Sequence, residues 1–150
     1  MRIAAIFFLV AAAIMSTSAN ATSVEELFQK FGLFGTWAGD CSQPPSPTNP
    51  HVSITTPTAG LVLEDHDLGP DFAINHYSVL SAEMVSETRL SVEVIFQPGS
   101  ETEERQRLVF QIRDGTRRTM FNQPDGGMVR VKDGIALARG TKTPILNKCP

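Results

Sequence analysis

From His51 onward, apolar and polar residues alternate with a period of two, which is the spacing of a half-buried β-strand. Short segments rich in glycine, proline and aspartate interrupt this pattern, and these are hairpin signals. After Gly32 no segment has helical periodicity. The sequence therefore predicts β-strands at residues 51–56, 60–65, 72–82, 88–97, 103–113, 116–123, 128–132 and 135–139, after a first short strand within 33–41.

Eight or nine strands in one series predict an all-β fold, an antiparallel meander closed into a small barrel of about eight strands. Closure is favoured because it removes the exposed edges that an open meander would leave. A two-sheet sandwich is the alternative. If Asp114 and Gly115 form a two-residue turn, Phe110 should face Thr119 and Leu108 should face Phe121.

A short amphipathic helix is predicted before the first strand. Ser23 and Glu26 have the spacing of a capping box, and apolar residues recur at helical intervals from Val24 to Phe31. A helix of about eight residues is not stable alone, so it must dock on the barrel. Residues 43–50 include four prolines and predict an irregular surface loop.

Residues 1–21 have the pattern of a cleavable signal peptide. Arg2 precedes an apolar run from Ile3 to Met15, and Ala19-Asn20-Ala21 is a typical cleavage site. The run of about 13 residues is shorter than the roughly 20 needed to span a membrane as a helix. We therefore expect an exported chain in the periplasm or outside the cell, with residues 22–150 as one barrel domain and no stable membrane insertion.

Cys41 and Cys149 are the only two cysteines, and export predicts that they form a disulfide. The charges divide unevenly along the chain. Residues 22–99 contain two basic and ten acidic residues, whereas residues 100–150 contain ten basic and six acidic ones. The total is weakly acidic, which argues against general binding to nucleic acid.

Gly35-Thr36-Trp37 on the first strand follows the short helix and precedes a long loop, a run of hairpins and a late cysteine. In this layout the chain resembles the lipocalin and wider calycin barrels, in which a Gly-x-Trp near the start closes the barrel floor. The resemblance implies an eight-stranded barrel that holds a small ligand. The chain departs from the lipocalin pattern in having no clear helix after the last strand.

The sequence contains little that indicates catalysis. It has no nucleophile motif, phosphate loop or dinucleotide fingerprint, so we expect a non-enzymatic protein without a cofactor. His66 and His76 lie among carboxylates and would bind a divalent ion if a turn at Gly69-Pro70 brought them together. Their spacing matches no standard metal motif, so a solvated acidic turn is the favoured interpretation, with no metal site.

Several arginines of the basic half fall on consecutive strands. A cluster on one face would hold a carboxylate or phosphate, whereas simple outward-facing charges are the favoured alternative. We take Trp37, Arg107 and Arg130 as candidate ligand-binding residues.

The preferred function is a barrel that binds a small apolar or amphiphilic ligand in its interior or mouth, the mouth being built by the proline-rich loop and residues 69–72. The alternatives are an inhibitor or interaction protein that acts on an exported enzyme or envelope component, and a structural factor of the cell envelope.

Overall fold

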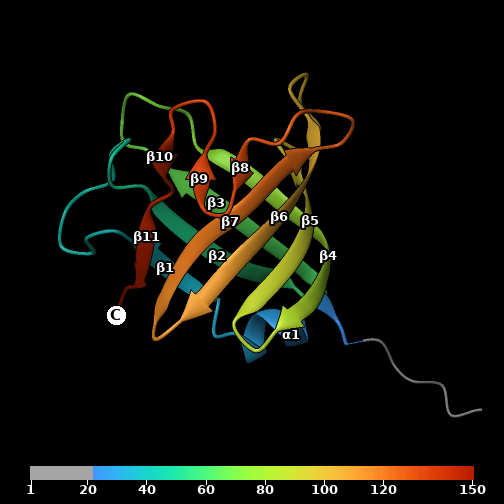
Figure 1. The fold of residues 1–150 in the computed structure, drawn as a ribbon. Helices are drawn as coiled ribbons and strands as arrows, with labels where there is room; N and C mark the ends of the chain where they lie inside the picture. The colour runs from blue at the N-terminus through green and yellow to red at the C-terminus, as the bar shows by residue number, and fades with distance from the viewer. Residues whose placement is uncertain (1–21) are drawn as a thin grey trace, which may run out of the picture.

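The structure, a computed structural model, describes residues 22–150, so the predicted signal peptide lies outside the described residues. The fold is an antiparallel eight-stranded closed barrel with three additional short strands and one helix (Figure 1). The eight barrel strands are β1 (Gly35–Ala38), β2 (His51–Thr58), β3 (Leu61–Asp67), β4 (Asn75–Ser86), β5 (Arg89–Phe96), β6 (Glu104–Arg113), β7 (Thr116–Pro124) and β11 (Ile145–Lys148). The predicted all-β barrel is confirmed, and the sandwich is not formed.

Each barrel strand pairs with the next in sequence, and β11 closes the barrel between β7 and β1. The closing strand is the one that the sequence analysis missed. The expected last strands at 128–132 and 135–139 are instead reduced to β8 (Val131–Lys132) and β9 (Ile135–Ala136). With β10 (Thr141–Lys142) they extend the sheet from β7 and lie outside the barrel. We call residues 124–144 the extension.

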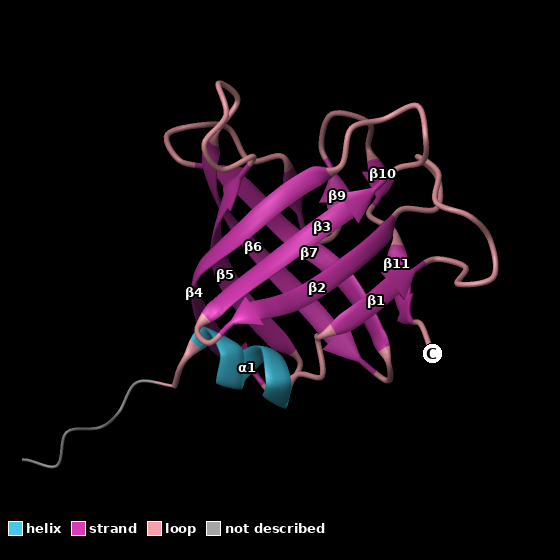
Figure 2. Ribbon diagram, turned by 180° about the vertical axis from the view of Figure 1, so that it is seen from behind, coloured by secondary structure: helices cyan, strands magenta, loops and turns pink. Residues whose placement is uncertain are grey.

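Helix α1 (Val24–Lys30) lies across one end of the barrel, called the lower end here (Figure 2). The predicted capping box is present, since the Ser23 side chain accepts from the backbone of Glu26 and the Glu26 side chain accepts from the backbone of Ser23. The helix buries Leu27 and Phe28 against the core. It therefore closes the lower end, as its apolar stripe requires. Helix α1, the one helix among residues 22–150, is not long and apolar enough to span a membrane.

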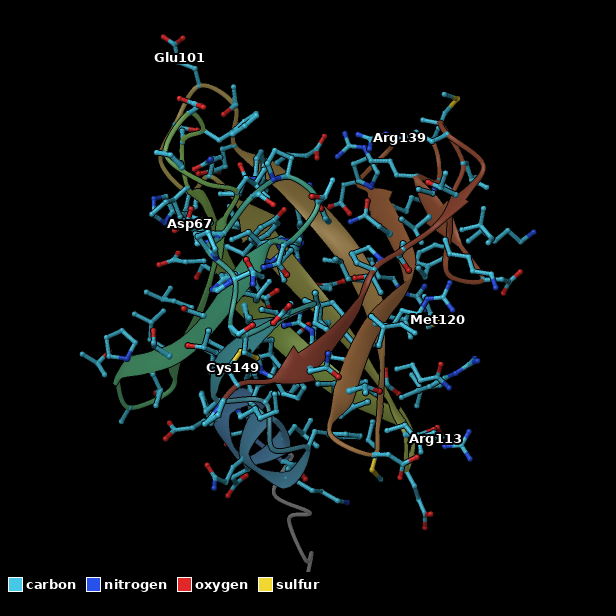
Figure 3. The ribbon with its side chains drawn as sticks, turned by 90° about the vertical axis from the view of Figure 1, so that its left-hand side faces the viewer. Asp67, Glu101, Arg113, Met120, Arg139 and Cys149 are labelled. Carbon is cyan, nitrogen blue, oxygen red and sulfur yellow. A yellow bond between two sulfur atoms is a disulfide. The ribbon has the colours of Figure 1, made fainter. Side chains whose placement is uncertain are left out.

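The predicted turn and part of the predicted register are confirmed. Asp114 and Gly115 have φ angles of 52° and 71°, as a tight turn between antiparallel strands requires, and Phe110 pairs with Thr119. The expected pairing of Leu108 with Phe121 is wrong, because the register shifts after Phe110 and Leu108 pairs with Asn122. The shift is a β-bulge in which Met120 is the extra residue of β7. Figure 3 shows Met120 on the outer side of the barrel.

The predicted disulfide between Cys41 and Cys149 is formed, with the two Cα atoms 5.6 Å apart. It lies beside the pairing of β1 with β11, where Trp37 pairs with Lys148 and Ala38 with Asn147. Both strands are only four residues long, so the covalent bond holds the seam where the barrel closes. A stable disulfide indicates an oxidising compartment outside the cytoplasm.

Candidate functional site

The lower half of the barrel interior is filled by apolar side chains. Trp37 is the largest of them and is 2% exposed. Its Nε1 donates a hydrogen bond of 2.7 Å to the carbonyl oxygen of Leu33, and the Lys148 ammonium lies 4.8 Å from the centre of its ring. Phe28 and Leu33 are fully buried next to it. Trp37 therefore serves as a packed floor of the barrel interior.

A buried ion pair crosses the interior farther up. Arg117 of β7 and Glu64 of β3 are 3% and 5% exposed, and Nη2 of Arg117 donates to Oε1 of Glu64 at 2.5 Å. The same carboxylate oxygen lies 2.6 Å from Nε2 of His66. The Arg117 guanidinium also lies 4.0 Å from the centre of the Phe110 ring. The pair joins β3 to β7, through two residues that are 53 positions apart in the sequence.

Charges inside the barrel set the protonation of this cluster. Burial alone would raise the pKa of Glu64, but the Arg117 charge and the hydrogen bond with His66 lower it to about 2. Burial, helped by the charge of Glu64, raises the pKa of Tyr77 to about 12. At neutral pH the interior therefore holds an ionised carboxylate, a guanidinium and a neutral phenol.

The space beside this cluster is very small. A cavity of about 30 Å³ is lined by Glu64, His66, Tyr77, Val94, Leu108, Phe110 and Thr119. This volume fits one or two water molecules and no organic ligand. Nη1 of Arg117 is buried and has no hydrogen-bond partner in residues 22–150, so the guanidinium is only partly satisfied. The interior is built as a packed scaffold rather than as an open calyx.

A chain of polar side chains leads from the interior to the upper end. Nδ2 of Asn122 donates to Gln106 at 2.8 Å, and Nε2 of Gln106 donates to Glu104 at 2.6 Å. Arg130 donates to both oxygens of Glu104, at 2.7 and 2.8 Å. These fork-like bonds fix the start of the extension against β6, where the barrel opens.

A large pocket lies in the extension, next to this ion pair. It has a volume of about 1100 Å³, enough for a small organic ligand. One wall is residues 124–131 and the other is residues 136–139 and 141–144, and Glu104 also lines the pocket. Met128 and Leu137 are 87% and 50% exposed, although both are large and apolar. We call this pocket the extension groove.

The three predicted ligand-binding residues do not come together. Trp37 is in the floor, and Arg107 is exposed on β6, where its guanidinium lies 5.7 Å from the centre of the Phe121 ring. Arg130 alone lines the extension groove. The arginine that enters the interior is Arg117, which the sequence analysis did not separate from its outward-facing neighbours.

His66 and His76 also lie apart. His66 points into the barrel toward Glu64, whereas His76 is exposed and its Nδ1 lies 2.7 Å from Asp65. Since Asp65 and His66 are consecutive on β3, these contacts lie on opposite faces of the sheet. Within residues 22–150, no group of three or more histidine, cysteine and acidic side chains is arranged to hold a metal ion.

The proline-rich loop and the turn at 69–72 contact each other at the barrel rim. A Cβ atom on Gly69 would lie 2.8 Å from the carbonyl oxygen of Pro45, so only glycine fits there. Neither segment lines the extension groove, although the sequence analysis expected them to form the binding mouth.

The groove was not predicted, because residues 128–132 and 135–139 were expected to be two ordinary barrel strands. The turn signals at Asp125-Gly126-Gly127 and Asp133-Gly134 were correct indications of reversals. A cue was available in Met128, Val129 and Leu137, Ala138, which are adjacent apolar pairs that break strict alternation.

No family model matches this chain, and no curated protein or solved structure matches it either.

Proposed function

We propose that this chain is an exported, non-enzymatic binding protein of the periplasm whose ligand is a small apolar or amphiphilic molecule. The barrel has the strand number and closure of the lipocalin-like barrels, and membership of the calycin group is part of this proposal. The binding site that we assign differs from the calyx of that group, because it is the extension groove and not the barrel interior.

One observation carries this assignment. Large apolar side chains of a soluble domain are ordinarily buried, yet Met128 and Leu137 face a groove of about 1100 Å³. The interior cavity of about 30 Å³ has no comparable capacity. A concave apolar surface with a few polar groups at its edge is the usual form of a small-molecule site.

The direct test uses N-phenyl-1-naphthylamine, an uncharged probe that becomes fluorescent in apolar surroundings. We expect saturable binding to the mature protein and its loss in the double variant Met128→Ser/Leu137→Ser. The matched control is Leu80→Ser, since Leu80 is 41% exposed on β4 and does not line the groove. No binding by the wild type, or unchanged binding by the double variant, contradicts the proposal.

The second candidate is an inhibitor that presents the proline-rich loop to an exported enzyme. The loop is held in shape by Asn49, whose Oδ1 accepts from the backbone of Asp40 at 2.8 Å and whose Nδ2 donates to Asp40 O at 3.0 Å. A loop ordered before binding loses less entropy on binding. If this function holds, the chain inhibits an exported protease or lysozyme, and replacing residues 44–48 by Gly and Ser abolishes inhibition. Equal inhibition after that replacement excludes the loop.

A further inference from the structure

We propose that the extension groove selects alkyl carboxylates, with Arg139 and Lys142 binding the carboxylate and the apolar walls holding the chain. This inference rests on the proposed function and adds the charge and head group of the ligand. In this inference Arg139 and Lys142 determine the specificity of the groove, although no sequence motif identified either residue.

The charges around the groove support an anionic ligand. Three cationic side chains line it, Arg130, Arg139 and Lys142, against the two carboxylates of Glu104 and Asp125, which leaves one net positive charge. Both carboxylates already have cationic partners. Glu104 is bound by Arg130 at 2.7 Å, and Asp125 lies 3.7 Å from Nε of Arg105 on β6.

Arg139 and Lys142 differ from Arg130 in having no acidic partner. In the described part of the chain, neither side chain takes part in a salt bridge. Both line the same groove. A guanidinium and an ammonium are suited to a carboxylate, to which arginine can donate two parallel hydrogen bonds. The surplus of one positive charge matches the single negative charge of a carboxylate better than the two of a phosphate monoester.

Arg139 lies in the turn between β9 and β10, and Lys142 is the last residue of β10. Gly140 lies in that turn with a φ of +65°, and its backbone N–H donates to Ala136 O at 2.8 Å. Leu137 and Ala138 immediately precede Arg139, and Met128 lines the other wall. Figure 3 shows Arg139 at the same end of the barrel as Asp67 and Glu101, opposite Arg113. The groove thus combines apolar side chains with a small excess of cationic ones, as an amphiphile with an anionic head requires.

The test compares four probes with the same ten-carbon chain: decanoate, decanol, decyltrimethylammonium and decyl phosphate. Each is tested for displacement of N-phenyl-1-naphthylamine from the mature protein, at concentrations below its critical micelle concentration or, for decanol, its solubility limit. We expect decanoate to bind at least about 10-fold more tightly than decanol. The ionised carboxylate of decanoate accepts stronger, charge-assisted hydrogen bonds than the hydroxyl group of decanol does. The cationic probe should be the weakest, and added salt should reduce the preference for decanoate.

Variants assign the preference to the two cations. In Arg139→Gln/Lys142→Gln, decanoate should lose its advantage over decanol, whereas decanol should bind as it does to the wild type. The control is Arg113→Gln/Lys132→Gln, because Arg113 and Lys132 are exposed and neither lines the groove. These are surface substitutions, so all four sites should tolerate the change without unfolding.

The outcomes separate this inference from the proposed function. Equal binding of decanoate and decanol, an unchanged preference in Arg139→Gln/Lys142→Gln, or tighter binding of decyl phosphate than of decanoate overturns the carboxylate assignment. In each of these cases, loss of decanol binding in Met128→Ser/Leu137→Ser still supports the groove as the ligand site. If none of the probes binds the wild type, the proposed function fails together with the inference.

Discussion

The barrel interior and the extension groove differ in how their apolar side chains are buried and how their charged side chains are paired. In the interior, Glu64 and Arg117 neutralise each other in a packed core with about 30 Å³ of free space. In the groove, Met128 and Leu137 are exposed around about 1100 Å³, and neither Arg139 nor Lys142 makes a salt bridge to residues 22–150. We propose that the barrel supplies stability and the extension supplies recognition, so substitutions should separate the two.

The largest effect on stability should come from breaking the buried ion pair. Arg117→Ala leaves the Glu64 carboxylate buried without its charge partner, which should lower the free energy of unfolding by about 3–5 kcal/mol. Denaturation by urea, followed by tryptophan fluorescence, measures this loss. The control is Arg107→Ala on the exterior of β6, which should change the free energy of unfolding by about 0.5 kcal/mol or less.

A double variant tests whether the loss comes from the unpaired charge. Replacing both partners, in Glu64→Leu/Arg117→Met, removes the charges together and keeps most of the apolar volume, so much of the stability should return. If the double variant is no more stable than Arg117→Ala, the isolated carboxylate is not the cause.

The disulfide should contribute the next largest amount. Cys41→Ser/Cys149→Ser leaves the short pairing of β1 with β11 as the main closure of the seam, and opens a loop of 108 residues. We expect the free energy of unfolding to fall by about 2–4 kcal/mol. Reduced wild-type protein should show the same decrease. A loss below about 0.5 kcal/mol in either sample would show that strand pairing alone closes the barrel.

Acid should weaken the buried ion pair of the interior. Because the folded-state pKa of Glu64 is lowered from 4.5 to about 2, its contribution to stability is complete above pH 4.5 and is lost as the pH falls toward 2. In Glu64→Gln this contribution is absent, so its free energy of unfolding should fall less steeply over the same range. Equal slopes for variant and wild type in urea titrations from pH 5 to 2 would contradict the assigned pKa.

The smallest effect on stability should come from the groove itself. Met128→Ser/Leu137→Ser removes apolar surface that is already in water, so the free energy of unfolding should change by no more than about 0.5 kcal/mol per substitution. Thermal unfolding monitored by circular dichroism checks this, with Leu80→Ser as the control. A loss of several kcal/mol would show that these side chains belong to the core, and the comparison between the two regions would fail.

Much of the scaffold was predictable from local sequence signals. Alternation located β2 to β7 approximately, the capping box located α1, and Asp114-Gly115 fixed a turn. The closing strand β11 was not predictable in the same way. Its four residues follow Pro144 and bury only Leu146, so its identity as a strand depends on pairing with β1 and β7.

The site was less predictable because it depends on which face each side chain takes. A one-residue bulge at Met120 reverses the alternation within β7, so that Arg117 and Asn122 both point inward although they are five positions apart. The resemblance carried by Gly35-Thr36-Trp37 implied the floor position of Trp37, which is buried there, whereas its role as a ligand-binding residue stays a prediction. The groove arises from the way in which the two segments of the extension fold beside β7, which periodicity does not report.

The most direct test of the account is to locate the bound ligand by NMR, following ¹³C methyl resonances during a titration with decanoate. We predict saturable shifts at Met128, Val129 and Leu137 in the groove, with little change at Val62, Leu90 and Val92, which are buried in the interior. Shifts concentrated at the interior methyl groups would contradict the central claim and would return the binding site to the barrel itself.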